Sequence, residues 1–323
     1  MMKGGIAFAG TILHDKICSI AEYPRLGSLA EISAVESAVG GLVPNDSVDI
    51  KKLSPALPVY ALGRIGDDES GKFCSEYMRQ SGVDVSGIKV HHGSVTGFTN
   101  VMSIVGGQRT FFTHSGANGE FSYDDIPWDG LSVSMLHLGY FLLLEAVDSG
   151  DGIKILKEAR GRGIKTSVDF ITGLSERYAG LLPVLRYVDN LIVNEQEAGA
   201  LAGVEPTDCN LAEIAEKLYR DSGAERVIVH SPKYSVCVSK SGVTSLGSYK
   251  LPDGFIKGTT GAGDAFCSGA LLGIYEEKSD LEILEMATIA ATASLRSHDA
   301  TGAIEPIDIL RERFKNLERR DAP

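Results

Sequence analysis

A glycine-rich turn followed by an aspartate carries the clearest chemical signal in the sequence. Gly261, Ala262 and Gly263 directly precede Asp264, and the small, apolar run that follows is typical of a buried helix. A Gly-rich turn that opens a helix directs backbone N–H groups and the positive end of the helix dipole at one spot, and so can bind an anion. Asp264 would lie beside that anion, where a carboxylate could take a proton from a hydroxyl. The alternative is a tight turn with an acid near a helix N-terminus, where acids are stabilising anyway.

A second candidate site follows the apolar run Leu191–Val193. Asn194 and Glu197 are three residues apart and share a face if a helix begins there. An amide and a carboxylate so placed could hold a hydrated Mg²⁺ near phosphates. The alternative is a helix start that is simply rich in acids.

A third candidate is the pair Gly40-Gly41 with Asn45. The glycines could let the backbone approach a small polyhydroxylated ligand, and the Asn amide can both donate and accept hydrogen bonds. A plain turn is the alternative.

Two nucleotide motifs are excluded. Residues 66–72 have the spacing G-x-x-x-x-G-K, but Phe73 replaces the hydroxyl that would bind Mg²⁺, and three acids within the motif would repel phosphates. The glycines at 258, 261 and 263 do not have the dinucleotide spacing and lie too late in the chain for it.

Histidines and cysteines predict no metal site. The seven histidines show no ligand spacing with cysteine or with a second histidine beyond the adjacent pair His91-His92, and the five cysteines contain no Cys-x-x-Cys pair. Free thiols in a reducing compartment are therefore expected.

Composition describes an ordinary globular chain of 323 residues, with 43% hydrophobic and 23% charged residues. A net charge of −12 argues against nucleic acid or an anionic membrane as the main partner. No apolar run approaches the ~20 residues of a membrane span. The apolar residues 5–13 fit a first buried strand better than a signal peptide, so we expect a cytoplasmic protein.

The elements that must position these residues alternate between strand and helix. From Ser134 onward, short apolar strands are separated by helical patterns of about 12 residues, which predicts a parallel sheet covered on both faces. Ligands of such sheets bind at the carboxyl ends of the strands. Residues 16–39 and 96–115 have strand-like alternation, with a hairpin turn at Gly106-Gly107, and could form a small separate sheet.

Taken in order, these pieces resemble the ribokinase-like (PfkB-type) carbohydrate kinase family. The likeness runs over nearly the whole chain, and its most specific motif is Thr259-x-Gly261-Ala262-Gly263-Asp264. The other matching motifs are Gly10-x4-Asp15, Gly40-Gly41-x3-Asn45, Leu62-Gly63-x2-Gly66-Asp67-Asp68-x2-Gly71, Thr96-Gly97, Gly107-Gln108-Arg109-Thr110, Gly116-Ala117-Asn118 and Asn194-Glu195-x-Glu197-Ala198.

The resemblance implies an α/β fold, a three-layer sandwich with a mainly parallel central sheet and a small β-sheet lid, over a single domain of residues 1–323. It implies ATP as phosphoryl donor, Mg²⁺ between the phosphates, and a small sugar or sugar acid as acceptor. By position, Asp264 is similar to the family's general base, and Gly261, Ala262 and Gly263 to its anion hole.

By the same likeness, Asn194 and Glu197 resemble the residues that position Mg²⁺ through water. Four further residues resemble the family's sugar-contacting set: Asp15, Gly40, Gly41 and Asn45.

The chain departs from the family at three places. Gly258 stands where an acidic residue or Asn is usual, and in K⁺-activated members an Asp there helps hold the cation, so K⁺ dependence is not implied. Residues 230–235 replace the usual nucleotide loop, with Lys233 as a substitute cation. Gly139 replaces a Glu of several ribose kinases and Leu13 their Asn, which argues against ribose itself.

The sequence therefore predicts an ATP-dependent sugar kinase. A nucleoside kinase of the same fold and a non-catalytic sugar- or nucleotide-binding paralogue are the alternatives. Arg109 could reach a carboxylate or phosphate from the lid, although solvation at the surface is the simpler expectation. Exposed lid strands invite pairing with a second lid, so a homodimer through the lid stays open.

Overall fold

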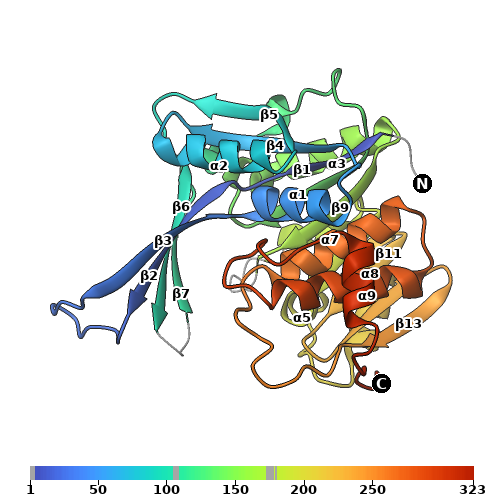
Figure 1. Ribbon diagram of the computed structural model, residues 1–323. Coiled ribbons are helices and arrows are strands. Elements are labelled where there is room, and N and C mark those ends of the chain that lie inside the picture. The colour runs from blue at the N-terminus through green and yellow to red at the C-terminus, as the bar shows by residue number, and fades with distance from the viewer. Residues whose placement is uncertain (1–3, 105–108, 172–177, 179) are drawn as a thin grey trace.

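The computed structural model describes residues 4–104, 109–171, 178 and 180–323. The described residues form a nine-stranded sheet in the order β13-β12-β11-β10-β9-β8-β1-β4-β5 (Figure 1). Strands from β5 to β11 pair in parallel, while β12 and β13 add an antiparallel hairpin at one edge. The strands are β1 (Gly5–Ala9), β4 (Val59–Gly66), β5 (Asp84–His91), β8 (Val133–Phe141), β9 (Lys165–Phe170), β10 (Asn190–Asn194), β11 (Arg226–His230), β12 (Tyr234–Ser239) and β13 (Gly242–Gly247).

Helices cover both faces of this sheet, as the alternating pattern predicts. The α-helices are α1 (Leu42–Leu53), α2 (Glu69–Gln80), α3 (Gly152–Gly161), α4 (Leu182–Leu185), α5 (Glu195–Ala202), α6 (Leu211–Ser222), α7 (Ala262–Tyr275), α8 (Asp280–Ser294) and α9 (Ile307–Phe314). Shorter helical turns are η1 (Gly116–Glu120), η2 (Tyr123–Asp125) and η3 (Val147–Asp151).

Alternating side chains of the strands divide the interior into two cores. In β1, Ile6 and Phe8 pack with α1, α2, α7, α8 and α9, whereas Ala7 and Ala9 pack with α3, α5 and α6. Residues at odd and even positions of a strand point to opposite faces, so a strand that is apolar throughout must be buried on both. This arrangement is the expected three-layer sandwich.

A second sheet, which we call the lid, projects from the main body (Figure 1). It consists of β2 (Leu13–Ile20), β3 (Ile32–Gly40), β6 (Gly97–Ile104) and β7 (Arg109–His114), in the order β3-β2-β6-β7. The structure thus has the small separate sheet predicted from alternation in these segments. The predicted turn at Gly106-Gly107 lies outside the described residues.

Two expectations about composition are also met. All five cysteines are free thiols, and four of them are buried. Within the described ranges, no helix is both long enough and apolar enough to cross a membrane.

Candidate active site

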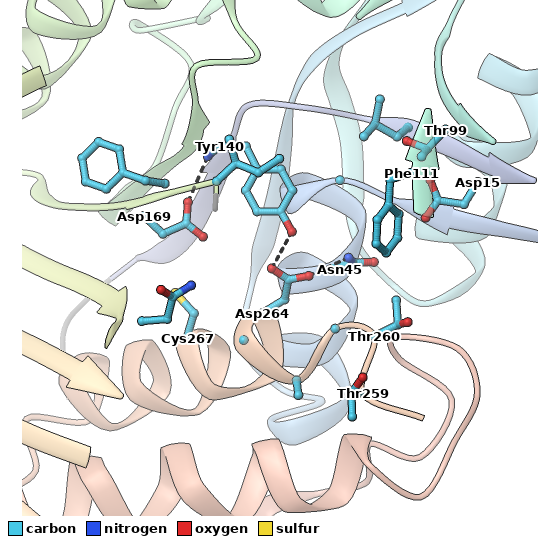
Figure 2. A pocket seen from close by; sticks show the side chains of 18 of the residues that line it. Asp15, Asn45, Thr99, Phe111, Tyr140, Asp169, Thr259, Thr260, Asp264 and Cys267 are labelled. Carbon is cyan, nitrogen blue, oxygen red and sulfur yellow. Dashed lines mark hydrogen bonds between the residues drawn. The ribbon is translucent and has the colours of Figure 1, made fainter. Parts of the chain in front are cut away.

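A cavity of about 1110 Å³ opens between the lid and the carboxyl ends of the central strands. Lid residues such as Thr99 line one side, and the ends of β8, β9 and β10 line another. The turn before α7 supplies a third wall, from residue 256 to 264 (Figure 2). The topology therefore brings the lid segments and the glycine-rich turn to one place, as predicted from the position of ligand sites in parallel sheets.

The glycine-rich turn begins α7 in a conformation that requires glycine. Gly261 is the N-cap residue with φ of 76°, which disfavours a side chain. A Cβ atom there would also lie 2.4 Å from Cβ of Ala300. No side chain caps this helix at residue 261. The first-turn N–H groups of a helix have no partner within it, although that of Ala262 donates to the carbonyl oxygen of Thr259 at 3.3 Å. The start of α7 therefore has the donor geometry of an anion site.

Asp264 lies in the first turn of α7 and is held by two side chains from other elements. Its Oδ1 accepts a hydrogen bond of 2.8 Å from the hydroxyl of Tyr140, and its Oδ2 accepts one of 2.7 Å from Nδ2 of Asn45. We call these three residues the Asp264 cluster (Figure 2). Only 7% of Asp264 is exposed, so its position is fixed from two sides at the wall of the cavity.

Burial tunes this carboxylate toward the role of a base. Desolvation raises the pKa of Asp264 from 3.8 to about 6, and the charge of Asp169 adds to the rise. The hydrogen bonds from Asn45 and Tyr140 oppose it, since they stabilise the ionised form. A carboxylate with a pKa near 6 is ionised at neutral pH, yet it is more basic than an exposed one.

Asn45 reaches Asp264 because α1 begins at the cavity. The helix starts after Gly41, whose φ of 83° and close approach to the carbonyl oxygen of Thr11 both require glycine. Asn45 lies in its first turns, and no described residue hydrogen-bonds to its buried Oδ1. The amide thus orients Asp264 with one end and keeps an acceptor at the other.

Asp15 enters the cavity from lid strand β2. Burial, together with the charge of Asp264, raises its pKa to about 6, against the effect of a hydrogen bond with Thr99. Its Oδ1 is buried with no hydrogen-bond partner in the described part of the chain. A Cβ atom on Gly40 would lie 2.2 Å from this carboxylate, so Gly40 makes room for it. Gly41 lines the cavity, whereas Gly40 lies behind Asp15.

Asn194 and Glu197 line the same cavity and also form a capping box at the start of α5. Asn194 Oδ1 accepts from the backbone N–H groups of Gln196 and Glu197, each at 2.9 Å. The Glu197 carboxylate accepts from the Asn194 side chain at 2.8 Å and from its backbone at 3.1 Å. The pair therefore caps the helix, as in the plainer interpretation of the sequence, and at the same time places a buried carboxylate in the cavity wall.

Two residues of the site were missed in the sequence. Tyr140 has φ of 57°, which is unusual for a residue other than glycine, and this turn brings its hydroxyl onto Asp264. Asp169, at the end of β9, accepts from the backbone N–H of Tyr140 at 2.9 Å. In the sequence, only the place of Asp169 at the end of a predicted strand indicated that it could belong to the site.

The simpler expectation for Arg109, solvation at the surface, is wrong. Its guanidinium donates to the hydroxyl of Thr260, in the turn before α7, and the residue is partly buried and lines the cavity. Lys233, in contrast, pairs with Asp208 and is not among the cavity residues, so it supplies no cation there.

Close contacts surround two glycines at which the chain departs from the family pattern. A Cβ atom on Gly258 would lie 2.6 Å from the carbonyl oxygen of Ser297, which leaves no space for an acidic side chain. One on Gly139 would lie 2.1 Å from Oδ1 of Asp169. At the altered nucleotide loop, His230 stacks on Phe266 at 4.4 Å, and burial lowers the pKa of His230 to about 4, so the ring is neutral.

Comparison with known proteins agrees with this geometry. A ribokinase of Haemophilus influenzae is 25% identical over 313 residues, covering 94% of this chain and 96% of the ribokinase. An adenosine kinase of Saccharomyces cerevisiae is 27% identical over 285 residues, covering 84% of this chain and 81% of that enzyme.

Solved structures show the same fold. The structure of Arabidopsis thaliana ribokinase complexed with ribose and ATP has a TM-score of 0.79 at 22% identity, covering 97% of this chain and 99% of that one. The family profile of the pfkB family carbohydrate kinases matches residues 15–307, almost the whole length. The resemblance noted in the sequence is thereby confirmed: this chain is a carbohydrate kinase of the pfkB family.

Proposed function

We propose that this kinase transfers the γ-phosphoryl group of ATP to a hydroxyl of a small sugar or sugar acid, with Asp264 as general base. One observation carries the proposal: Asp264, with its pKa raised to about 6, lies beside the start of α7 in a cavity closed on one side by the lid. Phosphoryl transfer needs little covalent chemistry from the protein, so positioning and charge neutralisation decide its rate.

The acceptor would bind between the lid and the Asp264 cluster. Oδ1 of Asp15 and Oδ1 of Asn45 are buried acceptors that lack partners among the described residues, so hydroxyl groups of a ligand would satisfy them. Both side chains line the cavity, and they approach it from different elements. A polyhydroxylated acceptor fits this arrangement better than an apolar one.

The donor would lie across the turn before α7 and the end of β10. Gly261, Ala262 and Gly263 would direct N–H groups at the transferred phosphoryl group. Because both oxygens of Glu197 already accept hydrogen bonds within the cap, this residue and Asn194 suit contact with Mg²⁺ through water. The cation would supply charge neutralisation between the phosphates.

The proposed reaction requires little movement of the protein. Asp264 accepts the proton of the acceptor hydroxyl while Tyr140 and Asn45 keep its oxygens in place. The donors at the start of α7 stabilise the negative charge that develops on the phosphoryl oxygens. The lid excludes water from the cavity and so disfavours hydrolysis of the donor.

Three residues bear on the choice of acceptor. Gly139 and Leu13 replace side chains that several ribose kinases carry, so ribose is a poor candidate. Arg109 brings a guanidinium from the lid to the turn before α7, where it could pair with a carboxylate of a sugar acid or with a phosphate. The steric limit at Gly258 speaks against a K⁺ site held by an acidic side chain there.

A nucleoside kinase is the second candidate, because Phe111 of the lid lines the cavity and could stack on a base (Figure 2). The similarity to an adenosine kinase supports the same alternative.

Release of ADP over a panel of pentoses, hexoses, sugar acids and nucleosides tests the proposal. Each acceptor is assayed with the wild-type chain and with Asp264→Asn. Turnover on a sugar or sugar acid that the variant lacks supports the proposal, and turnover on nucleosides alone favours the second candidate. Ligand binding without turnover on any acceptor would contradict both.

We further propose that the lid pairs with a second lid. Strand β3 is an edge strand of this sheet, and residues 32–37 are all exposed, including Ile32 and Val35. A long exposed edge strand with apolar side chains can pair with a strand of another molecule.

A further inference from the structure

Beneath Asp264, four potential metal-binding atoms from four different elements converge on one point. They are Oδ2 of Asp46 in α1, Nε2 of His137 in β8, Oδ2 of Asp169 in β9 and Sγ of Cys267 in α7; we call these residues the four-donor cluster. The His137 nitrogen lies 3.6 Å from the sulfur, 3.7 Å from the Asp46 oxygen and 3.9 Å from the Asp169 oxygen. All four atoms lie within 4.8 Å of one another, and all four residues are buried.

The histidine has the orientation of a ligand. Nδ1 of His137 lies 2.8 Å from the hydroxyl of Ser167, and the ring is completely buried. When Nδ1–H donates to Ser167, the lone pair of Nε2 points into the cluster. Metal-binding histidines are held in the same way, by a partner on the nitrogen that does not bind the metal.

The two carboxylates are oriented as well. Oδ1 of Asp46 accepts from Ser268 at 2.9 Å, and Oδ1 of Asp169 accepts from the backbone of Tyr140 at 2.9 Å. The second oxygen of each faces the cluster. For Oδ2 of Asp46, which is fully buried, the described residues provide no hydrogen-bond donor. An unpartnered buried carboxylate oxygen aimed at three other donors indicates a missing positive charge.

The charges around the four-donor cluster also indicate that a cation is missing. Among the described residues, only the side chain of His137 lies within ion-pair distance of Asp46 or Asp169. No described lysine or arginine forms an ion pair with either carboxylate. Asp264 adds a third carboxylate nearby, since its charge acts on Asp46. A buried carboxyl group stays ionised only when it is paired or binds a cation, and otherwise burial raises its pKa, as it does for Asp46 without metal.

We propose that the four-donor cluster is a Zn²⁺ site. One sulfur, one nitrogen and two oxygens suit Zn²⁺, whereas Mg²⁺ prefers six oxygen ligands. In a tetrahedral zinc site with the usual bond lengths, ligand atoms lie about 3.3–3.6 Å apart. The distances of 3.6, 3.7 and 3.9 Å around His137 would shorten by up to about half an ångström, and the other pairs of donor atoms, all within 4.8 Å, by up to about 1.5 Å.

The sequence did not predict this site because its ligands are scattered along the chain. Positions 46, 137, 169 and 267 have no motif spacing, and they meet only because α1, β8, β9 and α7 pack together. The site is also separate from Asn194 and Glu197, which form the cap of α5.

The bound ion would hold the elements that position the general base. Asp46 follows Asn45, Cys267 lies one turn after Asp264, and Asp169 holds the backbone of Tyr140. These four ligands are positioning residues, and two of them, Asp169 and Cys267, also line the cavity. This role depends on the proposed kinase mechanism, but the binding of metal does not.

Metal binding is measured on the full chain without any assay of turnover. Cys209 is exposed and could bind metal by itself, so all measurements use a Cys209→Ser background. The protein is treated with a chelator and titrated with Zn²⁺, and the bound metal is counted by elemental mass spectrometry. Co²⁺ then replaces Zn²⁺, because a thiolate ligand gives Co²⁺ a charge-transfer band in the near ultraviolet. We expect about one ion per chain and this band.

Cys267→Ser should abolish the band and weaken Zn²⁺ binding by more than about 100-fold, since even the loss of an outer partner of a ligand costs 10–100-fold. Cys237→Ser is the matched control, because Cys237 is a free thiol of β12 that is equally buried and lies outside the cluster. It should leave both signals unchanged.

The proposal is overturned if the parent protein binds no stoichiometric Zn²⁺, if its Co²⁺ form lacks the thiolate band, or if Cys267→Ser keeps the band. The first two outcomes do not depend on the folding of Cys267→Ser. They would leave the cluster as a group of buried polar side chains around His137 that binds no metal.

Discussion

The Asp264 cluster and the lid face the same cavity, but they are built in opposite ways. Asp264 has a hydrogen-bond donor on each carboxylate oxygen, and its partners come from a helix and a strand end that are packed in the core. On the lid, six consecutive residues of β3 are exposed, and Asp15 presents an oxygen with no partner among the described residues. The Asp264 carboxylate is fully hydrogen-bonded without ligand, while the lid has groups that only a ligand or a second protein would satisfy.

This difference separates the reaction from the choice of substrate. A preorganised base costs no reorganisation at the moment of transfer, and it can serve any hydroxyl that reaches it. Unsatisfied groups in the lid select the molecule that satisfies them. Relatives with the same fold accordingly include a ribokinase and an adenosine kinase. Changes in the Asp264 cluster should therefore affect kcat, and changes in the lid should affect acceptor binding or assembly.

The largest effect is expected for Asp264→Asn. An amide cannot accept the acceptor proton, so kcat should fall by about 10²–10⁴-fold while the acceptor KM changes little. Steady-state release of ADP measures both quantities, and circular dichroism checks the fold of the variant. Turnover at the wild-type rate would show that Asp264 is not the base.

Asp15→Ala tests the lid. Loss of a buried carboxylate that accepts from the acceptor hydroxyls should raise the acceptor KM by about 10–100-fold, with a smaller change in kcat. Glu36→Ala is the matched control, because Glu36 is an exposed acid on the neighbouring strand β3. An equal effect of the two substitutions, or a loss confined to kcat, would contradict the division between the two regions.

The pH dependence of kcat distinguishes the Asp264 cluster from the lid. The pKa of Asp264 is raised to about 6, and the base acts only when ionised, so kcat should be half-maximal near pH 6, approach its full value about one unit above it and fall about tenfold per pH unit well below it. Because burial also raises the pKa of Asp15 to about 6, kcat at saturating acceptor is the quantity to follow. The Asp15→Ala variant should keep the acid limb of kcat. A flat kcat down to pH 4.5 would be incompatible with this assignment.

Tyr140→Phe should have a smaller effect. The hydroxyl of Tyr140 donates to ionised Asp264 and so lowers its pKa. Its removal should move the acid limb of kcat to higher pH by about one unit, since a hydrogen bond to a charged group contributes about 1.5–3 kcal/mol before other groups compensate. Tyr275→Phe is the control, because that hydroxyl donates to the carbonyl of Gly4, away from the cavity. A shift to lower pH would refute the role given to Tyr140.

The smallest effect on kinetics is expected for Val35→Lys. A charge on the exposed edge of β3 should prevent pairing between lids, while kcat per chain stays within about twofold. Sedimentation velocity measures the mass of the wild-type chain and of the variant. Leu281→Lys changes an exposed apolar residue of α8 and should leave the mass unchanged. A wild-type monomer would rule out the pairing.

Local patterns were sufficient to predict most of the fold and the position of Asp264 at the start of a helix. Alternating strands and helices predicted the three-layer sandwich, and the motif ending in Asp264 predicted the start of α7. Both depend on short-range properties: the periodicity of apolar residues and the demand for glycine at positive φ.

Contacts between distant elements could not be predicted in this way. Tyr140 reaches Asp264 only because its backbone adopts φ of 57°. A tyrosine in the sequence gives no indication of such a conformation. The four-donor cluster joins residues from 46 to 267, and its geometry depends on how helices pack on the sheet. The lack of space for a side chain at Gly258 is caused by the backbone of Ser297, a residue well separated from it in sequence.

The connection between β3 and α1 gives the two regions a mechanical link. The lid strand ends at Gly40 and the helix begins at Leu42, so Gly41 alone separates them. Asn45, which holds Asp264, lies one turn further along the same helix. A movement of the lid relative to α1 would bend the backbone at Gly41 and displace Asn45, the side chain that orients Asp264. Under the proposed mechanism, an acceptor bound beneath the lid would therefore act on the proton acceptor through this stretch of backbone.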